Sequence, residues 1–205
     1  MDGTRSAARG NAPGTQGERI AAPRPRVFVV SGPTAVGKGT VCTRLKTLHP
    51  EVFLSVSVTT RPPRPGEDEG ISYWFITGDE FDQLVADDGL LEWAVVHGAH
   101  RYGTPRRPVE EAVAAGRTVI LEIDLQGARQ VRTTYPQATH IFLAPPNWEE
   151  LVHRLRGRGT ETPEQQERRL RTAVRELEAR SEFDEVIVNG ELDETVHELV
   201  ELMRL

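Results

Sequence analysis

The sequence predicts an α/β domain in which a parallel core sheet is covered by helices on both faces. Short apolar runs of strand length alternate with helical patterns along the chain. Continuously apolar strands, without polar alternation, are typical of a parallel sheet that is buried on both faces. The first run also ends in a glycine-rich turn that leads into a helix, as expected for the same three-layer architecture.

Composition limits the possible classes of protein. The 205 residues are 38% hydrophobic and 27% charged, which fits one globular domain with room for an insertion. A formal charge of −6 argues against a nucleic-acid binder, and the single cysteine, Cys42, excludes an intrachain disulfide. The apolar runs are far shorter than the roughly 20 residues that span a bilayer. Residues 1–26 lack a signal-peptide core. We therefore expect a cytoplasmic location and no membrane partner.

Residues 1–26 are predicted to form a disordered extension. They are rich in Gly, Ala, Pro, Arg and Ser and show no apolar period, so they cannot offset the entropy of ordering. Five arginines against Asp2 and Glu18 give a local charge of +3. A solvated extension is the favoured interpretation, and contact with an acidic partner is the alternative.

The core elements follow in order along the chain. Runs rich in β-branched and aromatic residues predict strands at Val27–Val30, Val119–Leu121, His140–Leu143 and Glu185–Val188. Capping residues, prolines and glycines predict helices over 40–48 and 108–115, after the cap Asn147, and after a capping box at Thr162. The last helix is expected to bury one face formed by Leu170, Val174 and Leu177.

One segment, Ser55–Thr77, departs from this rhythm. It alternates in polarity, turns at Pro62–Gly70 and alternates again. That pattern predicts an antiparallel hairpin. We expect a small β-rich insertion between the first helix and the second core strand.

Residues 32–40, GPTAVGKGT, predict a phosphate-binding loop. Gly32, Gly37 and Lys38 have the GxxxxGK spacing between a strand and a helix. The glycines let backbone N–H groups converge on phosphate oxygens, toward which the helix points its positive end. Lys38 would supply charge for the β- and γ-phosphates, and only two lysines occur among the 25 basic residues. The alternative is a glycine-rich turn without a ligand.

The residue after Lys38 departs from the strict motif. It is Gly39, so the hydroxyl that normally binds Mg²⁺ is absent there. Thr40 can still bond a phosphate. Mg²⁺ would then be held by phosphates, water and a carboxylate.

A second phosphate site is indicated by Arg61 and Arg64. They lie three residues apart in a proline-stiffened turn, with Tyr73 expected across the hairpin. Two guanidinium groups on a stiff loop suit bidentate binding of a phosphate. The alternative is a pair of solvated loop arginines.

Glu92 lies within the apolar run LLEWA, near the segment Tyr102–Thr104. A carboxylate there is costly without a donor partner. Guanine offers N1–H and N2–H₂ as adjacent donors, which adenine cannot supply. The alternative is a partly exposed or ion-paired glutamate.

The strand beginning at Val119 ends in two acids, Glu122 and Asp124. Because the strand period is two, both are expected on one face, where a carboxylate could assist Mg²⁺. The alternative is a pair of acids in a strand-end turn.

Residues 154–180 hold eight arginines against five glutamates. Arg154 and Arg158 are spaced i,i+4 at a glycine-containing stretch. This fits a mobile lid that brings arginines to a transferring phosphoryl group. Much of the remainder is expected to be a salt-bridged helix surface.

Together these segments resemble the bacterial guanylate kinase family, ATP:GMP phosphotransferases among the P-loop nucleoside monophosphate kinases. The resemblance covers residue 27 to the C-terminus and rests on SGPTAVGKGT, SVSVTTRPPRPGE, ISYWF, LLEWA, RYGTP, LEIDLQGA, FLAPP, RGRGTET and VIVN. Gly39 departs from the Ser usual in the family and is similar to the loop of adenylate kinases. The resemblance implies a P-loop NTPase fold with a GMP-binding insertion at about 57–107 and a lid at about 154–172.

The resemblance also implies Mg²⁺-dependent transfer from ATP to GMP or dGMP, and the residues involved. The implied ATP-binding residues are Gly32, Pro33, Thr34, Ala35, Val36, Gly37, Lys38, Gly39, Thr40 and, near adenine, Asn189. The implied GMP-binding residues are Ser57, Arg61, Arg64, Tyr73, Glu92, Tyr102, Thr104 and Asp124. The implied catalytic residues are Lys38, Arg154, Arg158 and Arg169, with Asp124 as the candidate Mg²⁺ ligand.

Two other functions stay open from the sequence. One is a guanylate-kinase-like binding module without activity, against which the retained Gly37 and Lys38 argue. The other is a kinase for another nucleotide or a sugar phosphate, against which Glu92 and Thr104 argue. Comparison of GMP with AMP as acceptor separates these readings.

Overall fold

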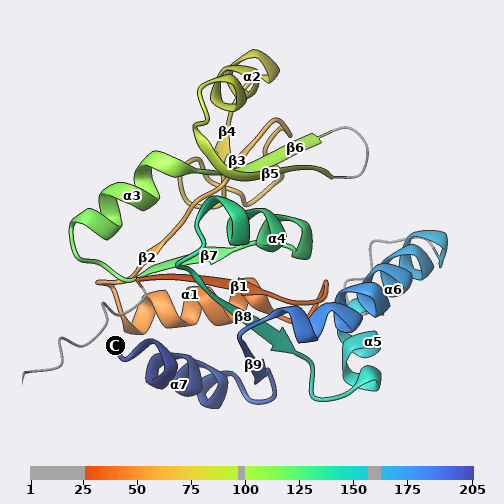
Figure 1. The fold of residues 1–205 in the computed structure, drawn as a ribbon. Helices are drawn as coiled ribbons and strands as arrows, with labels where there is room; N and C mark the ends of the chain where they lie inside the picture. The colour runs from red at the N-terminus through yellow and green to blue at the C-terminus, as the bar shows by residue number, and fades with distance from the viewer. Residues whose placement is uncertain (1–25, 97–99, 157–162) are drawn as a thin grey trace, which may run out of the picture.

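The computed structural model describes residues 26–96, 100–156 and 163–205 (Figure 1). The predicted extension therefore lies outside the described residues, except for Arg26. The described strands form one sheet of five strands and one of four. None of the described helices is both long and apolar enough to cross a bilayer.

The five-stranded core sheet confirms the predicted α/β class. Its order is β2-β7-β1-β8-β9, and every pairing in it is parallel. The strands are β1 (Val27–Ser31), β2 (Phe53–Leu54), β7 (Val119–Glu122), β8 (Thr139–Ala144) and β9 (Glu185–Val188). All four predicted strands are confirmed. Strand β2 was not predicted, because two residues are too few to form a recognisable apolar run.

Helices cover both faces of this sheet. They are α1 (Lys38–Leu48), α3 (Arg106–Ala114), α4 (Leu125–Thr134), α5 (Trp148–Arg156), α6 (Pro163–Glu178) and α7 (Leu192–Met203), with a 3₁₀ turn at Ala179–Glu182. Along β1, Phe28 and Val30 pack into a core with α1, α5, α6 and α7, while Val27 and Val29 pack with α3 and α4. This two-sided burial explains why the strand is apolar throughout.

The helix boundaries and one helix face differ in part from prediction. Helices α1 and α3 each begin two residues earlier than expected. Asn147 caps α5 as predicted, since its Oδ1 accepts from the Glu150 N–H at 2.8 Å. The expected capping residue Thr162 lies outside the described residues. In α6, Val174 is 43% exposed, and the fully buried residue between Leu170 and Leu177 is Ala173, so the predicted face was wrong at that position.

The second sheet has the order β4-β3-β6-β5. Its strands are β3 (Val58–Thr59), β4 (Trp74–Phe75), β5 (Leu90–Val96) and β6 (His100–Pro105), and α2 (Gly78–Ala86) accompanies them. The predicted hairpin in Ser55–Thr77 was wrong, because β3 and β4 pair in parallel. The intervening prolines lack ladder donors, and the long connection carries the chain back to run beside β3 in the same direction. The antiparallel partners are β6 with β3 and with β5.

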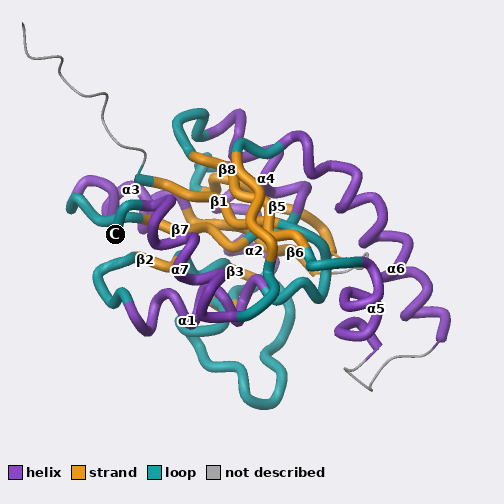
Figure 2. Tube along the Cα trace, turned by 90° about the horizontal axis from the view of Figure 1, so that it is seen from below, coloured by secondary structure: helices purple, strands orange, loops and turns teal. Residues whose placement is uncertain are grey.

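Two helices extend the molecule at one end. Figures 1 and 2 both place α5 and α6 side by side there, and contacts join the two helices. They follow β8 and lie toward the end of β1 from which the loop to α1 departs (Figure 1). Arg154 on α5 and Arg169 on α6 are therefore carried close to the predicted phosphate loop.

Candidate active site

The glycine-rich loop joins the end of β1 to the start of α1 through a tight turn. A Cβ on Gly32 would lie 2.2 Å from the Leu143 carbonyl oxygen, a distance that only glycine allows. Gly37 has φ 102°, in the left-handed region, and forms the N-cap of α1. The backbone thus fixes the loop shape while leaving Lys38 as the first residue of the helix.

The Lys38 ammonium group lies over its own loop. Its Nζ donates to the Gly32 carbonyl at 2.8 Å and to that of Pro33 at 3.4 Å. These carbonyls hold the positive charge at the loop. It would there face a phosphate bound to the loop amides.

Residues from the C-terminal half contact the same loop. The Arg154 guanidinium donates to the Val36 carbonyl at 3.0 Å and to Glu150 at 2.7 Å. Asn189 is buried and also donates to the Val36 carbonyl, at 2.7 Å. Arg169 donates to the Thr34 hydroxyl at 3.1 Å. The structure therefore brings these three predicted residues together around the loop.

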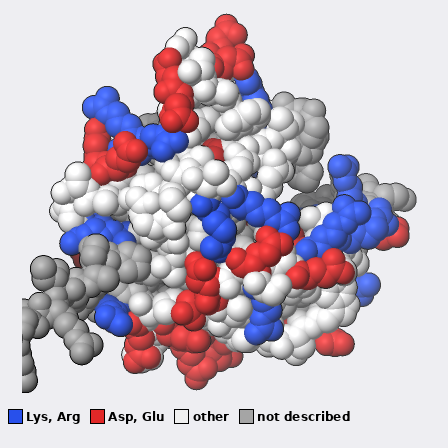
Figure 3. All heavy atoms as spheres, in the orientation of Figure 1, with Lys and Arg blue, Asp and Glu red and all other residues white. Residues whose placement is uncertain are grey.

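The predicted Arg158 lies outside the described residues. The predicted lid is nonetheless basic in its described part, since arginine side chains gather over α6 in the space-filling view (Figure 3). This positive surface adjoins the loop.

Glu176 is a loop contact that the sequence reasoning missed. Its Oε2 accepts from the Thr34 backbone N–H at 2.9 Å, so α6 places a carboxylate on a backbone donor of the loop. Burial raises the pKa of this carboxyl. The signal that could have found it is spacing: Glu176 follows Arg169 by seven residues, or about two helical turns, and so shares its face.

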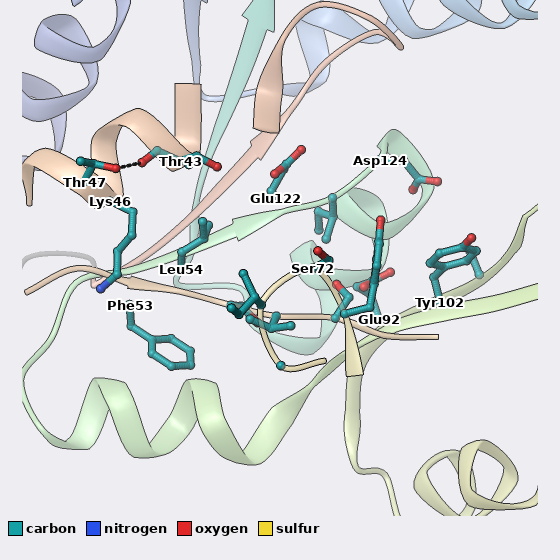
Figure 4. A pocket seen from close by; sticks show the side chains of 18 of the residues that line it. Thr43, Lys46, Thr47, Phe53, Leu54, Ser72, Glu92, Tyr102, Glu122 and Asp124 are labelled. Atoms are coloured by element: carbon teal, nitrogen blue, oxygen red, sulfur yellow. Dashed lines mark hydrogen bonds between the residues drawn. The ribbon is translucent and has the colours of Figure 1, made fainter. Parts of the chain in front are cut away.

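A cavity of about 950 Å³ opens beside the loop, between the core sheet and the second sheet (Figure 4). Six of the predicted nucleotide-binding residues line it: Ser57, Arg64, Tyr73, Glu92, Tyr102 and Asp124. The cavity also reaches Glu122 and, farther away, Lys46 on α1. Residues distant in the sequence thus converge on one space of ligand size.

Arg61 lies behind this wall rather than in it. It is 7% exposed, donates to Glu67 at 2.8 Å and to the Tyr102 hydroxyl at 2.9 Å, and stands over the Tyr73 ring. Glu67 also accepts from the Arg64 backbone N–H at 2.8 Å. Glu67 therefore organises both predicted arginines, a role that the sequence reasoning missed.

Glu92 is a buried carboxylate whose hydrogen-bond partner among the described residues is Thr104. The residue lies in β5 and is 7% exposed. Its Oε1 accepts from the Thr104 hydroxyl at 2.6 Å. Burial raises its pKa from 4.5 to about 7, and the negative charge of Asp124 acts in the same direction. When ionised, this buried carboxylate can accept further hydrogen bonds from a ligand.

The two strand-end acids both line this cavity, but the strand itself is shorter than predicted. Strand β7 ends at Glu122, and Asp124 instead caps α4, accepting from the Gly127 N–H at 2.8 Å. Glu122 lies at the phosphate loop, since a Cβ on Gly39 would be 3.5 Å from its Oε1. Figure 4 shows the two side chains well apart. Glu122 is thus the acid beside the loop, and its pKa is raised by burial.

Fold and site define a class of enzyme. A glycine-rich loop follows the central parallel strand β1, arginines from two helices contact it, and the cavity lies next to it. These are the parts of a P-loop kinase that phosphorylates a small nucleotide.

Comparisons with known proteins give the family. The guanylate kinase family model matches residues 24–205. The guanylate kinase of Cutibacterium acnes is 69% identical over 179 residues, which are 87% of this chain and 90% of that protein. That of Leifsonia xyli subsp. xyli is 55% identical over 186 residues, or 91% and 73%. The crystal structure of guanylate kinase from Anaplasma phagocytophilum superposes with a TM-score of 0.71 at 33% identity, covering 88% and 86%. This chain belongs to the guanylate kinase family.

Proposed function

We propose that this protein transfers the γ-phosphoryl group of ATP to GMP or dGMP, giving GDP or dGDP and ADP. Family membership supports the reaction. The observation that supports GMP as the phosphoryl acceptor is the buried Glu92–Thr104 pair in the cavity beside the loop. A carboxylate there accepts from guanine N1–H and N2–H₂, whereas adenine presents an acceptor at N1.

The chemistry needs positioning and charge rather than a general base. The attacking oxygen belongs to the GMP phosphate, which is already ionised near neutral pH. The task left to the protein is to align two phosphates and to stabilise charge in the transition state. Lys38, Arg154 and Arg169 are placed around the loop for this second role. Arg64 and Tyr73, which line the cavity, would hold the acceptor phosphate.

Mg²⁺ fits the residues around the loop. Among the described residues no three His, Cys, Asp or Glu side chains gather into a metal cage. Mg²⁺ in kinase sites commonly takes one or two carboxylates together with substrate phosphates and water. Glu122, beside Gly39, is the carboxylate that would contribute here, in place of the predicted Asp124. When bound, the ion would neutralise charge on the transferring phosphates.

The test is ADP formation by the purified chain with ATP and Mg²⁺, using GMP, dGMP, AMP, UMP or no acceptor. We expect turnover with GMP and dGMP only. Preference for AMP would overturn the assignment of guanine to Glu92. Absence of turnover with every acceptor would favour a binding module and overturn the enzyme.

A prediction concerns pH. Because kcat/KM reports groups in the free enzyme, kcat/KM for GMP should fall below about pH 7, roughly ten-fold per unit, as Glu92 gains a proton and loses its acceptor. The phosphate of GMP has a second pKa of about 6, so its protonation causes a further fall in kcat/KM at lower pH. In Glu92→Gln the fall in kcat/KM near pH 7 should vanish, while the fall caused by the GMP phosphate stays. An unchanged profile in that variant would contradict the assignment.

A second prediction concerns Gly39. Its backbone is not in the left-handed region, and a side chain there would meet Glu122 at ordinary contact distance. Gly39→Ser should therefore fold and, by adding a hydroxyl ligand, lower the Mg²⁺ concentration for half-maximal activity by about two- to ten-fold. Gly39→Ala supplies the same Cβ without the hydroxyl and is the matched control. An equal effect in both variants would rule out coordination by the hydroxyl.

A further inference from the structure

Gly127 lies in the first turn of α4, where the backbone does not demand glycine. Its φ angle does not lie in the positive range that favours glycine. Glycine within a helix is less favourable than alanine, because it has more freedom to lose on folding. Some contact must therefore explain the missing side chain.

That contact is the carboxylate of Glu92. A Cβ on Gly127 would lie 2.6 Å from Glu92 Oε2 and 3.0 Å from its Cδ. Both distances are far below van der Waals contact for carbon. The Gly127 N–H meanwhile donates to Asp124 at 2.8 Å. Gly127 thus stands between two carboxylates that line the cavity.

Neighbouring groups restrict the position of the Glu92 carboxylate. Its Oε1 accepts from the Thr104 hydroxyl, and its Oε2 lies 2.6 Å from where a Cβ of Gly127 would be. Strand β5 is itself fastened to α4, because the Gln130 amide accepts from the Trp93 N–H at 3.0 Å and donates to the Trp93 carbonyl at 2.8 Å. A methyl group added at residue 127 would therefore displace the carboxylate more readily than the strand.

We propose that Gly127 is a positioning residue for recognition of the nucleobase. By lacking a side chain it admits the Glu92 carboxylate against α4 and fixes the direction in which that carboxylate meets guanine. This inference rests on the proposed function. It assigns to α4, an element of the core, a part in selecting the acceptor.

The first test is Gly127→Ala in the full chain. We expect KM for GMP to rise by about ten- to a hundred-fold, as for a small displacement of a binding group, while KM for ATP and kcat change by less than about two-fold. The melting temperature should not fall, since alanine favours the helix. Gln126→Ala, an exposed neighbour on α4, is the matched control and should retain the KM for GMP.

A double-mutant cycle shows whether the effect passes through Glu92. With Glu92→Ala the side chain ends before the clash, so adding Gly127→Ala should cause no further loss in kcat/KM for GMP. An unchanged KM in Gly127→Ala, an equal rise in KM for ATP, or the same loss in both backgrounds would overturn this inference alone. Failure of the unaltered chain to use GMP would overturn the proposed function and the inference together.

Discussion

Replacement of Lys38 by alanine is expected to lower kcat for GMP phosphorylation by about 10³-fold or more, the scale of losing a charge that stabilises the transferring phosphoryl group. The structure places the Lys38 ammonium group at the loop, where two backbone carbonyls hold it. No other lysine can replace it, because Lys46 lies at the far end of α1. Steady-state kinetics at saturating ATP and GMP measure the loss.

The chain offers a matched control for this variant. Lys46 is the other lysine of the sequence and lies on the same helix. It donates to the Pro50 and Val52 carbonyls at 2.7 and 2.6 Å. Lys46→Ala should reduce thermal stability modestly and leave kcat within about two-fold, as expected for a lysine at the far end of the cavity, away from the phosphate loop. An active Lys38→Ala protein, or equal losses in both variants, would refute the assigned role.

Glu92→Gln is the second change with a large expected effect. The amide keeps the shape and one acceptor for Thr104, but it turns a donor toward the guanine donors. An unmatched buried donor pair should reduce kcat/KM for GMP by about 10²- to 10³-fold. Relative use of AMP should rise, because an amide can pair with the adenine edge. The measurement is the ratio of kcat/KM for the two acceptors.

The same variant should become more stable, which distinguishes it from a folding defect. Burial raises the pKa of Glu92 from 4.5 to about 7, so keeping it ionised above pH 7 costs folding free energy. At pH 8 the neutral amide should increase the free energy of unfolding by about 1–3 kcal/mol, a gain that fades as pH falls below 7. Glu110→Gln, an exposed change on α3, should alter neither activity nor stability. Loss of stability in Glu92→Gln would contradict this account.

The core of the fold was predictable because its signals are local. The continuous apolar runs at Val27 and Val119 mark strands buried on both faces, and the spacing of Gly32, Gly37 and Lys38 marks the loop. The parallel pairing of β3 with β4 was not predictable from alternation, which records exposure but not strand direction. Strand β2 is too short to carry any pattern.

The site was predictable in its membership more than in its geometry. The cavity gathers Glu92, Tyr102 and Arg64 as expected, from separate segments. Sequence could not show that Arg61 is turned toward Glu67, because an ion pair across six residues has no sequence pattern. The strand at Val119 was predicted to continue to Asp124 because the helix cap at that residue was not recognised.

The hydrogen bond between Glu176 and the Thr34 amide means that the loop carries a tethered anion. A tethered group competes at an effective concentration, typically in the millimolar range for a short connection. An incoming phosphate that takes the Thr34 amide must displace it. The observed affinity is then the intrinsic affinity multiplied by the fraction of molecules whose amide is open. Helix α6 thereby raises the concentration of polyanion that is needed to fill half of the loops.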